Sequence, residues 1–213
     1  MNTLIELYRK TTGADPSAVE GLAASGSNRR YYRLRGSRDL VGVIGTSLEE
    51  NEAFIELARH FGERGLPVPE VVAVSDDRMV YLQTDLGDTL LFQAIEKGRL
   101  TRSFSAEERE LLSRTIRMLP DLQFNGAVGL DFSKCYPLPQ FDTRTVLWDL
   151  NYFKYCFLKA TGLEFQEDRL ADDFQAMAEV LMRSMSSTFM YRDFQSRNVM
   201  LRDGNPYFID FQG

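Results

Sequence analysis

The apolar positions of the chain change their spacing about two-fifths of the way along it. Short runs of alternating or continuous apolar residues, typical of strands, dominate the first part, and repeats of three and four residues, typical of helices, dominate the rest. We therefore expect a small sheet with one main helix, followed by a mainly helical region. The elements expected in the first part are helices over 4–11 and from Ser47 to about Gly65, and strands over 31–35, 40–44, 71–74 and 79–82.

The helix that begins at Ser47 has a capping-box pattern, with Glu50 three residues after the serine, and a second such box lies at Ser105 and Glu108. The later part predicts helices over 89–97, 105–119, 146–160 and 168–185, an irregular loop over 131–145, and short strands over 188–190, 199–201 and 207–209. The helix over 146–160 is unusually rich in aromatic residues. We interpret these as core packing in preference to a wall that stacks on a ligand.

Composition narrows the classes of function. The chain has 213 residues with 31 acidic and 25 basic side chains, a net charge of −6, so broad attraction to nucleic acid or anionic lipid is not expected. We therefore expect no nucleic acid as a partner. The chain has no long apolar window, so we expect no membrane span either, and we expect a cytoplasmic protein. The single histidine, His60, and two isolated cysteines argue against a histidine-based metal site or a Ser-His-Asp mechanism.

The chemistry gathers near residue 200. Here the pattern is a strand-like piece, a polar loop, a strand, a tight turn at 203–205, another strand and an acid, which brings Asp193, Asn198 and Asp210 to neighbouring strand ends. Oxygen atoms of Asn198 and Asp210 suit Mg²⁺ bound to a triphosphate, and Asp193 suits proton acceptance from an attacking hydroxyl. The structural alternative is that the two acids are turn or cap residues and that Asn198 bonds to backbone.

These residues also carry a family resemblance. Tyr191-Arg-Asp193, Asn198 and Ile209-Asp-Phe-Gln-Gly213 resemble the catalytic loop and metal-binding segment of the aminoglycoside phosphotransferase and choline kinase branch of the protein-kinase-like superfamily. Within that branch the chain most resembles bacterial sugar kinases of the N-acetylmuramate/N-acetylglucosamine type. Upstream segments agree in order and spacing, namely 24–33 with the nucleotide-loop hairpin, 65–69 with the helix-to-strand corner and 85–88 with the segment after the hinge.

The resemblance implies a bilobal α+β kinase-like fold, with an N-lobe over 1–83, a hinge over 84–88 and a C-lobe over 89–213 that contains the catalytic loop 191–198 and the metal segment 209–213. It implies that Asp193 is the catalytic base or a positioning residue and that Asn198 and Asp210 bind Mg²⁺. The residues implied to bind ATP lie in the turn that covers the phosphates (Ser25, Gly26, Ser27, Asn28, Arg29 and Arg30) and at the hinge, where backbone meets adenine (Gln83, Thr84 and Asp85). Arg192 and Gln195 are candidates for orienting the substrate.

The chain departs from the family pattern in three respects. Tyr191 stands where many relatives have histidine, and the strand over 40–45 lacks the usual phosphate-binding lysine, so its partner among Glu49, Glu50 and Glu52 is unassigned. Three arginines are candidates for the missing charge: Arg29, Arg30 and Arg33. The chain also stops three residues after Asp210, so we expect a fragment of a longer protein with an incomplete C-lobe and exposed apolar surface.

The resulting hypothesis is an ATP- and Mg²⁺-dependent phosphotransferase that acts on a hydroxyl of a small molecule, a sugar or an amino sugar. Two alternatives remain within the same fold, an aminoglycoside-modifying phosphotransferase and a pseudokinase-like nucleotide-binding module of a larger protein, which the missing lysine favours. A metal-dependent hydrolase is a poorer match, because one histidine and no clustered ligand pair offer little to hold a metal.

Overall fold

The computed structural model describes residues 1–22, 28–183 and 187–211. The chain divides into two compact units, one formed by Met1–Pro137 together with Thr188–Gly213 and the other by Leu138–Ser187. All of the predicted catalytic and metal-binding residues belong to the first unit. No helix in the described ranges is long and apolar enough to cross a membrane.

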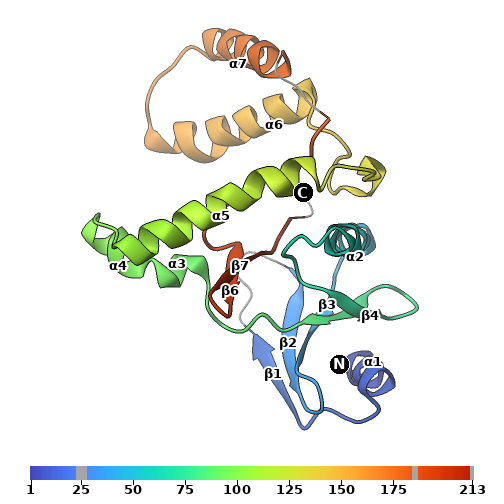
Figure 1. Ribbon diagram of the computed structural model, residues 1–213. Helices are drawn as coiled ribbons and strands as arrows, with labels where there is room; N and C mark the ends of the chain where they lie inside the picture. The colour runs from blue at the N-terminus through green and yellow to red at the C-terminus, as the bar shows by residue number, and fades with distance from the viewer. Residues whose placement is uncertain (23–27, 184–186, 212–213) are drawn as a thin grey trace. The chain divides into compact units, whose positions relative to one another are not determined.

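The first unit is built on a five-stranded antiparallel sheet (Figure 1), in the order β1-β2-β3-β5-β4. Its strands are β1 (Ala18–Leu22), β2 (Arg30–Arg35), β3 (Leu40–Ile44), β4 (Val71–Val74) and β5 (Val80–Thr84). The sequence predicted the last four and missed β1. That strand is exposed along almost its whole length and has a glycine at its fourth position, so it shows no apolar alternation.

The sheet has one helix against each face. Helix α1 (Asn2–Thr12) packs its Leu4 and Tyr8 against apolar side chains of β2, β3 and β5. Helix α2 (Leu48–Glu63) packs Phe54, Leu57 and neighbouring residues on the other face, in the largest apolar cluster of the unit. Burial of these apolar stripes is the main source of stability for both layers.

The predicted cap of α2 forms only in part. The Ser47 hydroxyl accepts the Glu50 amide at 3.2 Å, as the pattern requires. The Glu50 carboxylate pairs instead with Arg29, 3.3 Å away. The sequence pattern therefore located the start of the helix but not the partner of its first-turn acid.

The remainder of the first unit comprises α3 (Leu91–Ala94), α4 (Glu96–Thr101), α5 (Ala106–Phe124), η1 (Phe132–Lys134) and a hairpin of β6 (Val199–Arg202) with β7 (Asn205–Phe208). The single helix expected over 89–97 is wrong, because two short helices meet at Ile95. Helix α5 has the predicted reciprocal cap and continues through Pro120. The strand expected over 188–190 is wrong as well, since this stretch is irregular and the Phe189 amide donates to the Gln123 carbonyl.

The second unit contains α6 (Thr143–Phe153), η2 (Lys154–Leu158), η3 (Lys159–Thr161) and α7 (Glu167–Met182). The core interpretation of its aromatic residues is wrong, because Trp148 is 60% exposed and Tyr152 is 70% exposed. The buried residues of α6 are Thr145 and Val146, near its start, so the ring-bearing positions fall outside the stripe that is covered. Aromatic content alone did not indicate which side of this helix is buried.

Candidate active site

The β6–β7 hairpin brings Asn198 and Asp210 together. Asp203 and Gly204 adopt left-handed conformations at the hairpin turn, as in the tight turns that suit paired antiparallel strands. The strands pair over their full length, and beyond them the Ile209 amide donates to the Asn198 carbonyl at 3.0 Å. As a result the Asn198 side-chain nitrogen lies 3.5 Å from an Asp210 carboxylate oxygen.

Asp193 joins them from the preceding loop. Its carboxylate accepts the Gln195 side-chain nitrogen at 2.9 Å to each oxygen and the Asn198 side-chain nitrogen at 3.1 Å. The Asn198 amide donates to the Gln195 carbonyl at 2.8 Å, which closes the loop. The Asp193 carboxylate is exposed to solvent. The hydrogen bonds from the side chains of Gln195 and Asn198 hold it in a fixed orientation.

Tyr191 connects the loop to the segment that carries Asp210. The residue is buried, and its hydroxyl donates to the backbone carbonyls of Asn198, at 3.2 Å, and Ile209. Burial and the nearby negative charges of Asp210 and Asp193 raise the pKa of Tyr191, so the hydroxyl remains a donor at neutral pH. Tyr191 thus ties the loop over 191–198 to the segment that carries Asp210.

The segment after the hairpin is held by α2. Asp210 has a φ of 61°, a left-handed conformation that aspartate tolerates better than most residues. Phe211 is buried, and its ring lies 5.3 Å from that of Phe54 and 5.4 Å from that of Phe61. Residues 212 and 213 of the predicted metal segment lie outside the described residues.

Arg29 takes a distinctive position among the three candidate arginines. It is 3% exposed, donates to the Glu50 carbonyl at 2.8 Å and lies with its guanidinium 5.6 Å from the centre of the Phe54 ring. Arg30 is exposed, and Arg33 bonds to the segment after β5. Arg29 is thus the arginine of the three that contacts a glutamate of α2.

The surroundings of Arg29 favour its charged form. Burial works against the charge, but Tyr81, Tyr31 and Glu50 outweigh it and raise the pKa of Arg29.

The structure does not describe most of the turn that was predicted to cover the phosphates. Its residues Ser25, Gly26 and Ser27 lie outside the described residues. Asn28 is described and exposed.

The predicted hinge residues differ in which of their hydrogen-bonding groups lack a partner among the described residues and so suit a ligand. The Thr84 amide donates to the Glu70 carbonyl at 3.0 Å, and the Asp85 carboxylate bonds to Arg33. The side-chain oxygen of Gln83 is buried and accepts no hydrogen bond from the described residues. A buried acceptor of this kind is costly without a donor, so Gln83 suits a ligand that brings one.

Two further sequence expectations concern the catalytic loop. Gln195 contacts Asp193 directly, so its position suits orienting that carboxylate, and Arg192 is exposed beside it. Sequence reasoning did not identify the tie made by Tyr191 or the bonds from Arg33 to Asp85. Neither has a local signal, because the partners lie 18 and 52 residues apart.

The donor set fits magnesium. No group of three or more His, Cys, Asp or Glu side chains suited to a metal occurs among the residues with described positions. Mg²⁺ does not need one, because it is commonly held by one or two protein oxygens, phosphate oxygens of the substrate and water. The side chains of Asn198 and Asp210, which lie next to each other, contain oxygen atoms of the kind that could serve as this small number of ligands.

The fold, together with the loop that contains Asp193 and Asn198, is typical of phosphotransferases. Comparison with known protein families gives the same class. The model of the phosphotransferase enzyme family (APH) matches residues 18–213. The chain belongs to this family.

Two curated relatives have the same name, N-acetylmuramate/N-acetylglucosamine kinase. The Pseudomonas aeruginosa protein is 26% identical over 203 residues, which are 92% of this chain and 55% of the relative. The protein from Neisseria meningitidis serogroup B is 29% identical over 151 residues, which are 68% of this chain and 41% of the relative. The chain thus spans about half the length of the curated relatives it matches.

Solved structures show the same fold. The GDP and kanamycin complex of APH(2")-IIia matches with a TM-score of 0.62 and 16% identity, over 97% of this chain and 71% of that chain. A ternary complex of aminoglycoside phosphotransferase APH(4)-Ia with AMP-PNP and hygromycin B matches with a TM-score of 0.59 and 14% identity, over 99% and 71%. The predicted α+β kinase-like fold is confirmed.

Proposed function

We propose that this chain transfers the γ-phosphoryl group of ATP to a hydroxyl of a sugar or amino sugar. The observation that carries the proposal is the juxtaposition of Asp193, Asn198 and Asp210 in a loop and hairpin of a family phosphotransferase. The names of the two curated relatives support the sugar as acceptor.

Asp193 acts on the acceptor. Its carboxylate, oriented by Gln195 and Asn198, accepts the proton of the acceptor hydroxyl as the hydroxyl oxygen bonds to the γ-phosphorus. The bond between the γ-phosphorus and the β,γ-bridging oxygen breaks, and ADP leaves. Most of the rate enhancement in such a transfer comes from positioning and from charge neutralisation.

Asn198 and Asp210 would hold Mg²⁺. When bound, the ion supplies positive charge that neutralises phosphate oxygens and aligns them for transfer. Tyr191 and Phe211 fix the backbone on either side of these two ligands. Their role is therefore to keep the ligand spacing constant.

Arg29 takes the role of the missing lysine, with Glu50 as its partner on α2. The pair is buried on the arginine side, and the Phe54 ring that contacts Arg29 also stacks on Phe211, the residue after Asp210. A cation at this position offsets the charge of the phosphates. The side chain of Glu50, 3.3 Å from the guanidinium, orients it.

A screen of acceptors tests the proposal. The chain is incubated with Mg²⁺ and γ-labelled ATP together with N-acetylmuramate, N-acetylglucosamine, kanamycin or hygromycin B, and labelled products are separated by mass. We expect transfer to a sugar. Transfer to an aminoglycoside alone would reassign the acceptor, and ATP binding without transfer to any acceptor would favour the nucleotide-binding module.

The role of Arg29 predicts a large kinetic effect. Arg29→Met is expected to lower kcat/KM for ATP by about 10²-fold, as loss of one charge-stabilising group commonly does. Arg29→Lys restores the charge and is expected to recover part of the loss. Arg38→Met, a change at an exposed arginine that pairs with Glu70 and is not among the predicted nucleotide-binding residues, is the matched control. Equal activity of the Arg29→Met and Arg38→Met proteins, measured by ADP release with saturating acceptor, would contradict the assignment.

A further inference from the structure

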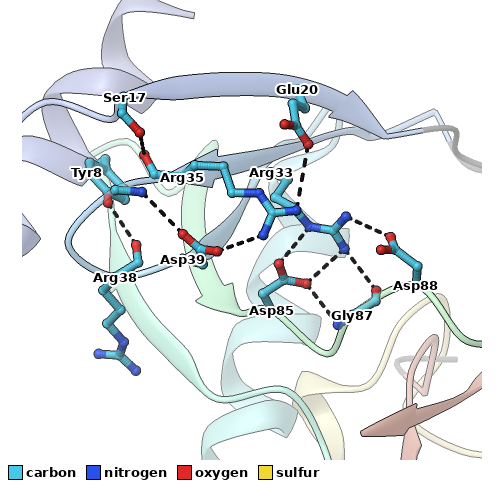
Figure 2. Close-up of polar contacts among 11 residues, drawn as sticks. Tyr8, Ser17, Glu20, Arg33, Arg35, Arg38, Asp39, Asp85, Gly87 and Asp88 are labelled. Atoms are coloured by element: carbon cyan, nitrogen blue, oxygen red, sulfur yellow. Dashed lines mark hydrogen bonds and ion pairs between the residues drawn. The ribbon is translucent and has the colours of Figure 1, made fainter.

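A buried arginine binds the segment that follows β5. Arg33, in the middle of β2, is 4% exposed and makes a two-pronged contact with Asp85, with bonds of 2.6 and 3.0 Å (Figure 2). It also bonds to an Asp88 oxygen at 2.7 Å and to the Gly87 carbonyl at 3.0 Å. We call Arg33, Asp85, Gly87 and Asp88 the hinge clasp.

The clasp crosses the sheet. Arg33 is paired with Val41 of β3, and Val41 is paired with Gln83 of β5. Paired residues of neighbouring strands present their side chains on the same face, so Arg33 lies on the face that also carries Gln83 and the apolar cluster beneath α2. From there its guanidinium reaches the chain directly after β5, across the width of β3.

The clasp leaves a short backbone stretch for other partners. The Asp85 carboxylate accepts the Gly87 amide at 2.9 Å in addition to Arg33, and Gly87 has a φ of 85°, which only glycine adopts easily. These contacts hold a tight turn at 85–88. Among the described residues, the backbone amides and carbonyls of Asp85 and Leu86 make no hydrogen bond.

Arginine is suited to this place and lysine is not. The planar guanidinium matches a carboxylate in two parallel bonds and still has donors for Asp88 and Gly87, whereas an ammonium group is a single point of charge. Hydrogen bonding to Asp85 outweighs the cost of burial and raises the pKa of Arg33, so the guanidinium stays charged.

We propose that Arg33 is a positioning residue for the nucleotide base, because the hinge clasp fixes the backbone of Asp85 and Leu86 before the base arrives. This inference rests on the proposed function, in which ATP binds at the hinge. A segment that is already ordered binds more tightly than one that must be ordered during binding. The clasp acts on the base end of the nucleotide and leaves its phosphates untouched.

The test compares ATP with a ligand that has no base. Dissociation constants for MgATP and for magnesium tripolyphosphate are measured by calorimetry on the unaltered chain, on Arg33→Lys and on Arg35→Lys. Arg35 is the matched control, since it lies on the same strand and pairs with Asp39 and Glu20 at the exposed surface (Figure 2). We expect Arg33→Lys to weaken MgATP by about tenfold, leaving tripolyphosphate unchanged, with no effect of Arg35→Lys.

Equal weakening of both ligands by Arg33→Lys, or none, would overturn the proposal. If Arg33→Lys melts below the assay temperature, Asp88→Asn replaces it, because the Asp88 side chain is 77% exposed and contributes one clasp bond. That variant is expected to weaken MgATP a few-fold and to spare tripolyphosphate, and unchanged MgATP binding would overturn the clasp. Failure of the unaltered chain to bind either ligand would instead count against the proposed function.

Discussion

Asp193→Asn is expected to lower kcat by about 10²–10⁴-fold, the usual contribution of a positioned acid or base, with nucleotide affinity nearly unchanged. The amide keeps the size of the carboxylate but is a poor proton acceptor. The substitution changes only the carboxylate group that Gln195 and Asn198 contact. The loop itself is closed by the backbone bond from the Asn198 amide to the Gln195 carbonyl, which the substitution does not touch. The measurement is single-turnover transfer with saturating acceptor, beside a titration with MgATP.

The split between turnover and affinity decides the role of Asp193. A loss of MgATP affinity as large as the loss of kcat would mean that Asp193 binds the metal or the phosphates. Gln195→Ala serves as a second variant, since it removes a donor to the carboxylate without touching the carboxylate itself. A smaller fall in kcat is expected there, and a fall equal to that of Asp193→Asn would show that Gln195 contacts the substrate.

Asp210→Asn is expected to weaken MgATP binding by roughly 10–100-fold, the range typical of a disturbed metal site, and to leave binding of metal-free ATP unchanged. The carboxylate supplies negative charge to the ion, and the amide does not. Asparagine tolerates the left-handed conformation of this residue as well as aspartate does, so the backbone has no reason to move. Calorimetric titrations with and without Mg²⁺ measure both affinities.

Asp203 supplies the matched control. It is an exposed aspartate of the same hairpin, also left-handed, with a φ of 50°, and it lies at the turn away from Asn198. Asp203→Asn therefore repeats the change of charge and the demand on the backbone. Its MgATP affinity is expected to equal that of the unaltered chain. Equal effects of Asp203→Asn and Asp210→Asn would remove the assignment of Asp210 as a metal ligand.

Much of the fold was predictable because local signals agreed with tertiary packing. Strands β2 to β5 have clear apolar runs, and Ser47 and Ser105 mark where α2 and α5 begin. Strand β1 was missed because it is exposed and contains a glycine, so it shows no apolar alternation. The aromatic stretch of α6 was misinterpreted because its rings suggested a buried helix, whereas residues such as Trp148 and Tyr152 are exposed.

The candidate site shows the same division. The approach of Asn198 to Asp210 was predictable, because a tight turn at Asp203 and Gly204 fixes the register of the hairpin between them. The pairing of Arg29 with Glu50 was not, because several arginines and glutamates lie close together in sequence on each side. The register of the strand decides which arginine faces α2, and the rotation of the helix decides which glutamate faces the sheet. In a strand, a shift of a single residue moves a side chain to the opposite face.

The most direct test of the central claim is a calorimetric titration of the unaltered chain with ATP, first with Mg²⁺ and then after its removal by a chelator. The account predicts saturable binding of one ATP per chain that weakens when Mg²⁺ is removed, because Asn198 and Asp210 bind the nucleotide through the ion. Binding of equal strength in both conditions, or no binding with Mg²⁺ present, would contradict it.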